Sequence, residues 1–167
     1  MKGSELLAQM RDGYPVAALD NDTRAGLIAA LLSDFRKSDA DMIVALTRDE
    51  SAMLARDHVN VGQDGLFACC WMLFMIGRLN DVPVVFEAKM TDFDTYCGID
   101  SVFLVPHGVE ATLEYAVAHG LDDLCSWVSD MRGDVDAAIK GWREATYFDD
   151  RPPTDSTLEE LSAWMRQ

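Results

Sequence analysis

Apolar residues recur at helical spacing along most of the chain. Leu27, Ile28, Leu31 and Leu32 fall on one helix face and follow a cluster of N-capping residues at 20–23. Similar stripes follow cap or turn residues throughout, and glycine, proline or polar clusters end them. The pattern predicts an all-α protein whose helices begin near Thr23, Ser38, Thr47, Asp64, Pro83, Thr91, Val109, Leu121, Val135 and Ser156.

Residues 66–76 form an unbroken run of eleven apolar positions. The run is too short to cross a bilayer, which takes about 20 apolar residues. It has no β-branched residue before Ile76, so helix is favoured over strand. A helix that is apolar on every side must be covered on every side. We therefore expect a central helix from Asp64 to about Leu79.

The second half of the chain predicts further short elements. The β-branched run 82–86 leaves a short strand as the alternative to a helix beginning at Pro83. A helix is expected from Thr91 to about Val105 in spite of Gly98. The chain is predicted to form one domain over 1–167, with core helices at about 20–146, a linker at 147–155 and a C-terminal helix at 156–167.

The turn at 77–83 (Gly-Arg-Leu-Asn-Asp-Val-Pro) resembles the hairpin turn of HEAT-type helical repeats, and 93–95 (Phe-Asp-Thr) resembles their inter-repeat turn. The segments 42–46, 84–88 and 109–113 then resemble the second helices of successive hairpins. The resemblance covers about 20–130 and implies a right-handed superhelix of stacked helical hairpins that works by binding. Because the spacing between hairpins is irregular, an irregular multi-helix bundle is the alternative.

Composition narrows the classes of partner. The chain of 167 residues carries 14 basic and 29 acidic residues, a net charge of −15. This charge argues against nucleic acid and against anionic membranes. The N-terminus lacks a basic stretch followed by an apolar one, so no signal peptide is expected and the protein is predicted to be cytoplasmic. The four cysteines, which include the adjacent Cys69 and Cys70, are expected to be free and buried.

The stretch between Leu79 and Met131, which we call the base-poor segment, contains ten acidic residues and only one lysine, Lys89. Many of its carboxylates fall at predicted helix starts, where the helix dipole stabilises them. That placement alone would make a solvated face, whereas the lack of exposed lysine and arginine favours an acidic face that binds a basic protein. The candidate partner-binding residues are Asp81, Glu87, Asp92, Asp94, Tyr96, Asp100, Asp122 and Asp123.

Catalytic and metal signatures are missing from the sequence. It contains no Gly-x-Ser-x-Gly and no glycine-rich phosphate loop, so no catalytic residue is assigned. His58, His107, Cys97 and Asp94 lack ligand spacing, so neither a metal nor a cofactor is expected. The alternative function is a small helical enzyme or ligand-binding bundle that would use Asp92, Asp94, Glu87 and Tyr96.

Two further expectations concern partners. Trp127, Trp142 and Trp164 fall on successive stripes and are expected in the core, although an exposed C-terminal helix with Trp164 and Met165 would indicate a homodimer. Small, strongly acidic bacterial proteins of this kind are similar to immunity proteins that neutralise a toxin. That resemblance implies a basic, toxin-like partner held by carboxylates in place of the anion that the partner normally binds.

Overall fold

The computed structural model describes residues 1–56 and 63–167. Within these residues the chain forms helices and no β-strand, which confirms the all-α prediction and excludes a strand at 82–86. The α-helices are α1 (Gly3–Arg11), α2 (Asn21–Asp34), α3 (Ala40–Arg56), α4 (Asp64–Ile76), α5 (Val82–Lys89), α6 (Phe93–Gly98), α7 (Val109–Ala118), α8 (Asp122–Ser129), α9 (Val135–Arg143) and α10 (Leu158–Met165). Short 3₁₀ helices are η1 (Val16–Ala18), η2 (Lys37–Asp39), η3 (Leu79–Asp81) and η4 (Ser101–Leu104).

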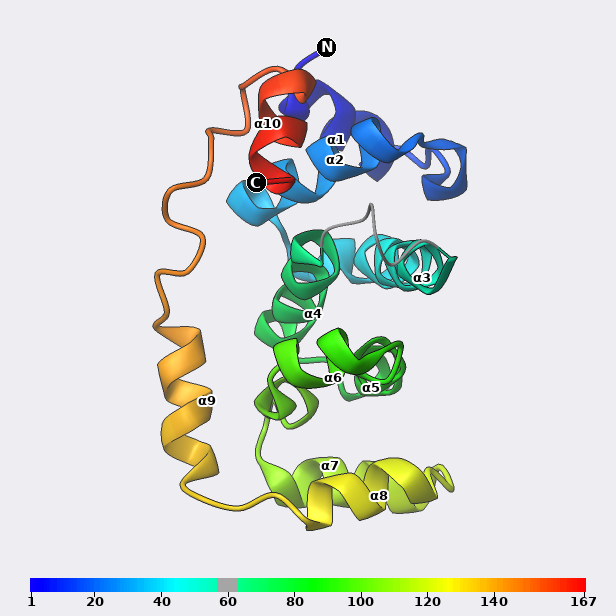
Figure 1. Ribbon diagram of the computed structural model, residues 1–167, viewed down its shortest axis with the longest axis vertical. Helices are drawn as coiled ribbons and strands as arrows, with labels where there is room; N and C mark the ends of the chain where they lie inside the picture. Colours follow the sequence, from blue (N-terminus) through cyan, green and yellow to red (C-terminus); the bar gives the residue numbers. More distant parts are fainter. Residues whose placement is uncertain (57–62) are drawn as a thin grey trace.

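The helices lie in successive layers along the long axis of the molecule (Figure 1). Helices α1, α2 and α10 form one end, α3 and α4 follow, α5 and α6 come next, and α7 and α8 form the other end. After α8 the chain turns back, and residues 131–157, which we call the return segment, run along one side of the stack to α10. Both termini therefore lie at the same end. Membership of a HEAT-type repeat family stays a prediction.

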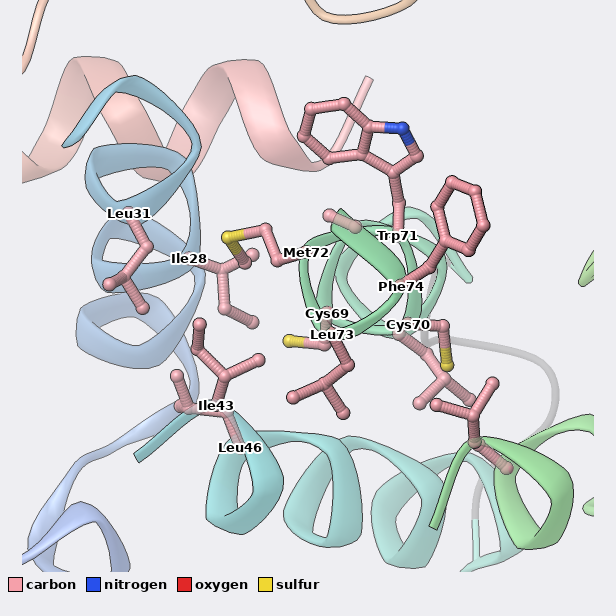
Figure 2. Close-up of a cluster of buried hydrophobic side chains, with 14 of the residues drawn as sticks. Ile28, Leu31, Ile43, Leu46, Cys69, Cys70, Trp71, Met72, Leu73 and Phe74 are labelled. Carbon is pink, nitrogen blue, oxygen red and sulfur yellow. The ribbon is translucent and has the colours of Figure 1, made fainter. Parts of the chain in front are cut away.

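Helix α4 is the central helix, as its apolar run predicts. Leu66, Cys69, Cys70 and Met72 are fully buried or nearly so. In Figure 2, α2 flanks α4 on one side with Ile28 and Leu31, and α3 lies on another with Ile43 and Leu46. The helix ends at Ile76 instead of Leu79 because Gly77 adopts φ +78°, a left-handed conformation that ends the helix.

Aromatic rings extend this core to the return segment. The Trp71 ring lies 5.8 Å from Phe35 and 5.1 Å from Phe148 of the return segment, measured between centroids. Trp142 on α9 lies 5.0 Å from Phe103 of η4. Trp142, like Trp127 and Trp164, is half-buried against the core cluster. The return segment therefore covers the side of α4 that α2 and α3 leave open.

Local interactions shift several helix boundaries from their predicted positions. A helix start at Thr47 is wrong: α3 continues through it, and Thr47 Oγ1 donates a 2.7 Å hydrogen bond to the Ile43 carbonyl within the helix. The single helix expected from Thr91 to Val105 is also wrong. It divides into α6 and η4 where Lys89 Nζ donates to the carbonyls of Tyr96 and Ile99. Helix α1 had no counterpart in the prediction.

Helix α10 packs against α2 and closes the end that holds both termini. Leu161 and Met165 are buried there, and Gly3 of α1 leaves room for the Leu161 side chain. Its N-cap is Thr157, which forms a capping box with Glu160, one residue beyond the predicted Ser156. The exposed C-terminal helix that would indicate a homodimer is therefore not seen, and the homodimer stays a prediction without that support.

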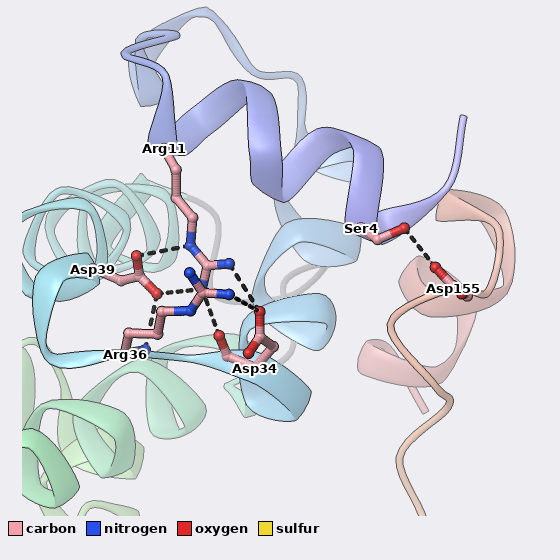
Figure 3. A network of polar contacts seen from close by, with 6 residues as sticks. All are labelled: Ser4, Arg11, Asp34, Arg36, Asp39 and Asp155. Carbon is pink, nitrogen blue, oxygen red and sulfur yellow. Dashed lines mark hydrogen bonds and ion pairs between the residues drawn. The ribbon is translucent and has the colours of Figure 1, made fainter.

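A network of ion pairs fixes α1 to the end of α2 (Figure 3). The Arg11 guanidinium donates to both oxygens of Asp39, at 3.0 and 2.7 Å, and at 2.8 Å to Asp34. Arg36 also reaches Asp34, at 3.1 Å. A bidentate guanidinium–carboxylate contact of this kind is directional, so it holds the last turn of α1 beside Asp34 and Asp39.

Candidate functional site

The structure removes Asp81 from the candidate binding residues. Its side chain is only 5% exposed, and Arg78 donates to both of its oxygens, at 2.8 and 2.7 Å. The charge count of the base-poor segment could not indicate this pairing, because Arg78 lies just before the segment begins. Asp81 therefore stabilises the turn before α5 and cannot contribute to an exposed face.

Asp92 and Asp94 lie at the start of α6, where they have different roles. Asp92 is half-buried and caps the helix, because its Oδ1 accepts a 2.8 Å hydrogen bond from the Thr95 amide. Asp94 is exposed in the first turn. Of this pair, Asp92 therefore caps the helix and Asp94 lies in solvent.

Exposed apolar side chains lie close to these acids along the chain, and two of them, Met90 and Phe93, were not among the predicted candidates. Phe93 is 77% exposed, and Met90 and Tyr96 are exposed as well. Phe93 is the first residue of a six-residue helix in which Thr95 is the buried residue. This position is the signal that could have indicated an exposed Phe93. We call Met90, Phe93 and Tyr96, with the carboxylate of Asp94, the α5–α6 corner.

Glu87 and Tyr96 line different hollows in the described part of the chain. Glu87 is exposed and lines a groove of about 330 Å³ between α3 and α5, opposite Arg48. Tyr96 lines a separate cleft. These two hollows separate Glu87 from Tyr96, and the alternative enzyme or ligand-binding hypothesis stays a prediction.

The cleft of Tyr96 has a volume of about 490 Å³ and lies where the chain leaves α8 for the return segment. We call it the α8–α9 cleft. Tyr96 and Trp127 meet there edge to face, with their ring centroids 5.3 Å apart. Asp100 is part of the same wall. The remaining lining residues are Ser101, Val102, Asp130, Met131, Arg132, Asp134, Val135 and Ala138.

Asp100 is the one predicted candidate that joins Tyr96 in this cleft. It is half-buried: Oδ1 accepts from the Val102 amide at 2.9 Å, and Oδ2 accepts from Trp142 Nε1 at 2.8 Å. The bond to Trp142 links the cleft to α9. Sequence reasoning could not find the cleft, because its walls come from separate segments that only the return of the chain brings together.

Lys89, the single lysine of the base-poor segment, lies behind the two rings. Its Nζ is 5.2 Å from the Tyr96 ring centroid and 5.4 Å from that of Trp127, and it donates to two backbone carbonyls. Burial lowers the pKa of the Lys89 ammonium, and the nearby Asp100 carboxylate opposes part of that shift. Lys89 is buried, so it adds no positive charge to the exposed surface.

Asp122 and Asp123 lie exposed in the first turn of α8. Among residues 1–56 and 63–167, neither forms an ion pair, and the same holds for Glu87 and Asp94. Asp94, Asp122 and Asp123 lie in the first turns of their helices, which is favourable for carboxylates, whereas Glu87 lies in the last turn of α5. These four carboxylates remain available to an external cation.

The cysteines and histidines form no metal cluster in the described part of the chain. Cys69 and Cys70 are free and buried, and burial raises the pKa of Cys70 to about 12. The expectation of burial is wrong for Cys97, which is exposed on the short surface helix α6, and Cys125 is half-buried. His107 and His119 lie beside the carbonyls of Gly77 and Tyr115. His58 lies outside the described residues.

Over the residues that the structure describes, no helix is both long and apolar enough to cross a membrane. Comparisons of the chain with protein-family models, with curated proteins and with solved structures give no match.

Proposed function

We propose that this protein is a binding module of the inhibitor type, which neutralises a basic protein partner through the exposed surface of the base-poor segment. The observation that carries the proposal is the set of exposed carboxylates that form no ion pair among the described residues: Glu87, Asp94, Asp122 and Asp123. Complementary charge of this kind accelerates encounter with a basic partner and excludes acidic ones.

The α5–α6 corner supplies the apolar part of such an interface. Phe93 is more than three-quarters exposed, and Tyr96 is exposed beside it. Interfaces concentrate their binding energy in a few aromatic anchors that a polar rim surrounds. Asp94, next to Phe93, belongs to such a rim. The corner therefore combines an anchor with charge, which a merely solvated face would not need.

An immunity-type role fits this chemistry. A basic partner that acts on a polyanion has a cationic surface, and carboxylates on this protein would occupy that surface in place of the polyanion. The net charge of −15 makes the whole molecule attractive to such a partner at long range. The resemblance to toxin-neutralising proteins, and the binding of a toxin-like partner, are part of the proposal.

Photo-crosslinking in the native cell tests the proposal. p-Benzoylphenylalanine is placed at Phe93, and at Tyr14, an exposed aromatic residue on the loop after α1, as the matched control. We expect a covalent adduct with one basic polypeptide from position 93 and none from position 14. An acidic partner, or equal adducts from both positions, would contradict the proposal.

Charge variants then test the carboxylates with the partner that crosslinking identifies. Asp94→Asn/Asp122→Asn/Asp123→Asn should slow association at least about tenfold at low salt, and the difference should shrink as salt rises. The control Asp12→Asn/Asp150→Asn/Glu159→Gln removes the same charge from exposed positions elsewhere and should change the rate much less. Equal slowing by both triples would show that only net charge matters.

A further inference from the structure

The α8–α9 cleft has a lining that selects for a particular kind of group. Its carboxylates are Asp100, Asp130 and Asp134, and its one cation is Arg132, so the lining has a net charge of 1 − 3 = −2. Tyr96 and Trp127 add two aromatic rings to the same wall. The volume of about 490 Å³ lies within the range of about 300–1,000 Å³ that is typical of ligand sites.

We infer that the α8–α9 cleft receives a positively charged side chain, an arginine of the basic partner, between the Tyr96–Trp127 rings and the carboxylates of Asp100, Asp130 and Asp134. This inference rests on the proposed function, because it names the group that the acidic surface recognises. It also places part of the interface on the return segment, which no sequence feature assigned to binding.

Arg132, the basic side chain that lines the cleft, is hydrogen-bonded to nearby backbone carbonyls. Arg132 donates to the carbonyls of Ser129 and Met131, each at 3.0 Å, and lies 3.8 Å from Asp130 with both side chains exposed. An exposed pair at that distance is weak. Arg132 therefore does not neutralise the cleft, and Asp130 can turn to an incoming cation at little cost.

The other two carboxylates are held in place by hydrogen bonds that leave them capacity to accept more. Asp134 Oδ1 caps α9 by accepting from the Ala137 amide at 2.9 Å. Asp100 is fixed by Val102 and Trp142. Each carboxylate oxygen can accept about two hydrogen bonds, so both residues can bind another donor without giving up the first. The cleft is thus preorganised for a donor with several N–H groups.

The ring pair already accommodates a cation on its inner side. Lys89 Nζ lies within about 5.5 Å of both ring centroids, the distance range of cation–π contacts. Its charge is shared with two backbone carbonyls and with Asp100, which limits repulsion of a second cation in the cleft. Arginine suits the cleft better than lysine, because its planar guanidinium stacks on aromatic rings and offers five donors.

A titration followed by NMR tests the inference without the partner. The probe is N-acetyl-arginine amide, and N-acetyl-citrulline amide is the neutral control of the same shape. The reporter is the Trp127 indole N–H, which donates to Ser101 Oγ at 3.3 Å and is assigned by its loss in Trp127→Phe. We expect saturable shifts with the arginine probe and at least about tenfold weaker binding of the citrulline probe.

Variants locate the site. Asp130→Asn/Asp134→Asn should weaken the arginine probe by about threefold to tenfold, and asparagine preserves the cap of α9. The matched control Asp122→Asn/Asp123→Asn removes two charges from the other end of α8 and should leave the affinity unchanged. Equal binding of both probes, equal loss in both double variants, or no shift of the Trp127 indole would overturn the inference.

This experiment separates the inference from the proposed function. If the arginine probe does not bind while crosslinking at Phe93 still yields a basic partner, the cleft assignment is wrong and the proposed function stands. If the probe binds in the cleft and crosslinking yields no basic partner, the cleft is a cation site and the proposed function is wrong.

Discussion

The two ends of the molecule use their charges in opposite ways. At the end formed by α1, α2 and α10, several charged groups are paired within the chain: Arg11 binds Asp34 and Asp39, and Arg166 binds Asp22. Further along the stack, the base-poor segment leaves Asp94, Glu87 and the α8 carboxylates without an ion pair among the described residues.

The difference shows which carboxylates stabilise the fold and which do not. A paired carboxylate near the termini holds one helix against another, so its loss should cost stability. An exposed carboxylate of the base-poor segment adds negative charge but contributes little to the stability of the fold. An acidic face of that kind therefore costs the folded state little free energy. Changes at the first end should therefore appear in unfolding, and changes at the second in binding.

The largest expected effect is at the ion pair between α2 and α3. Arg24 Nε donates to Glu50 Oε1 at 2.6 Å, and the two side chains are only 7% and 9% exposed. Arg24→Leu would leave the Glu50 carboxylate buried without its cation. We expect the free energy of unfolding to fall by about 3–5 kcal/mol, measured by urea denaturation.

The double variant Arg24→Leu/Glu50→Leu is the control for this pair. Because it removes the stranded charge, it should recover most of the lost stability. A double variant no more stable than Arg24→Leu would mean that the packing of Arg24, and not its charge, supports the interface between α2 and α3.

A smaller effect is expected at Asp34, where pH is the variable. Hydrogen bonds from Arg11 hold the pKa of the Asp34 carboxyl below its ordinary 3.8. Both folded and unfolded chains are ionised well above 3.8, so the stabilisation is complete there. As the pH falls, the unfolded chain is protonated first, and the stabilisation is lost down through the folded pKa.

Urea denaturation at several pH values measures this contribution. Because Asp34 is 45% exposed, we expect Asp34→Asn to be less stable than the unmodified protein by only about 0.5–1 kcal/mol at about pH 6. The difference should shrink as the pH falls below 3.8 and disappear once the pH is below the lowered folded pKa of Asp34. A difference that persisted at low pH would show that Asp34 acts through something other than its charge.

The smallest effect on stability is expected in the base-poor segment. In Asp94→Asn/Asp122→Asn/Asp123→Asn, the lost helix-dipole stabilisation is offset by relief of repulsion between neighbouring acids. The free energy of unfolding should stay within about 0.5 kcal/mol of the unmodified protein, while association with the basic partner slows. A loss comparable to that of Arg24→Leu would abolish the contrast between the two ends.

Local patterns predicted the helices best where one segment carries all the information. The run at 66–76 could only be a helix covered on all sides, and Gly120, with φ +65°, follows α7 where its pattern ends. The boundary at Gly98 failed because a side chain from outside the helix decided it. Lys89 ends α6 by binding the carbonyls of Tyr96 and Ile99, and no window of residues around Gly98 records that contact.

The sequence predicts which residues of the candidate site carry negative charge, but not which of them are exposed. The sequence identified the acids of the base-poor segment, but it could not tell Asp81, which Arg78 binds, from Asp94, which is exposed. It also did not indicate Phe93, which is exposed because α6 buries Thr95 and leaves Phe93 in solvent.

By itself, the sequence determined an all-α chain around one apolar helix, with its acids concentrated in a stretch poor in bases, because composition and helical period are local properties. Only the tertiary structure decided that residues 131–157 return along the stack. That return brings Asp134 and Val135 to Tyr96 and Trp127 and forms the α8–α9 cleft. The physical reason is that a cleft depends on distances between remote segments, which packing of the whole chain sets.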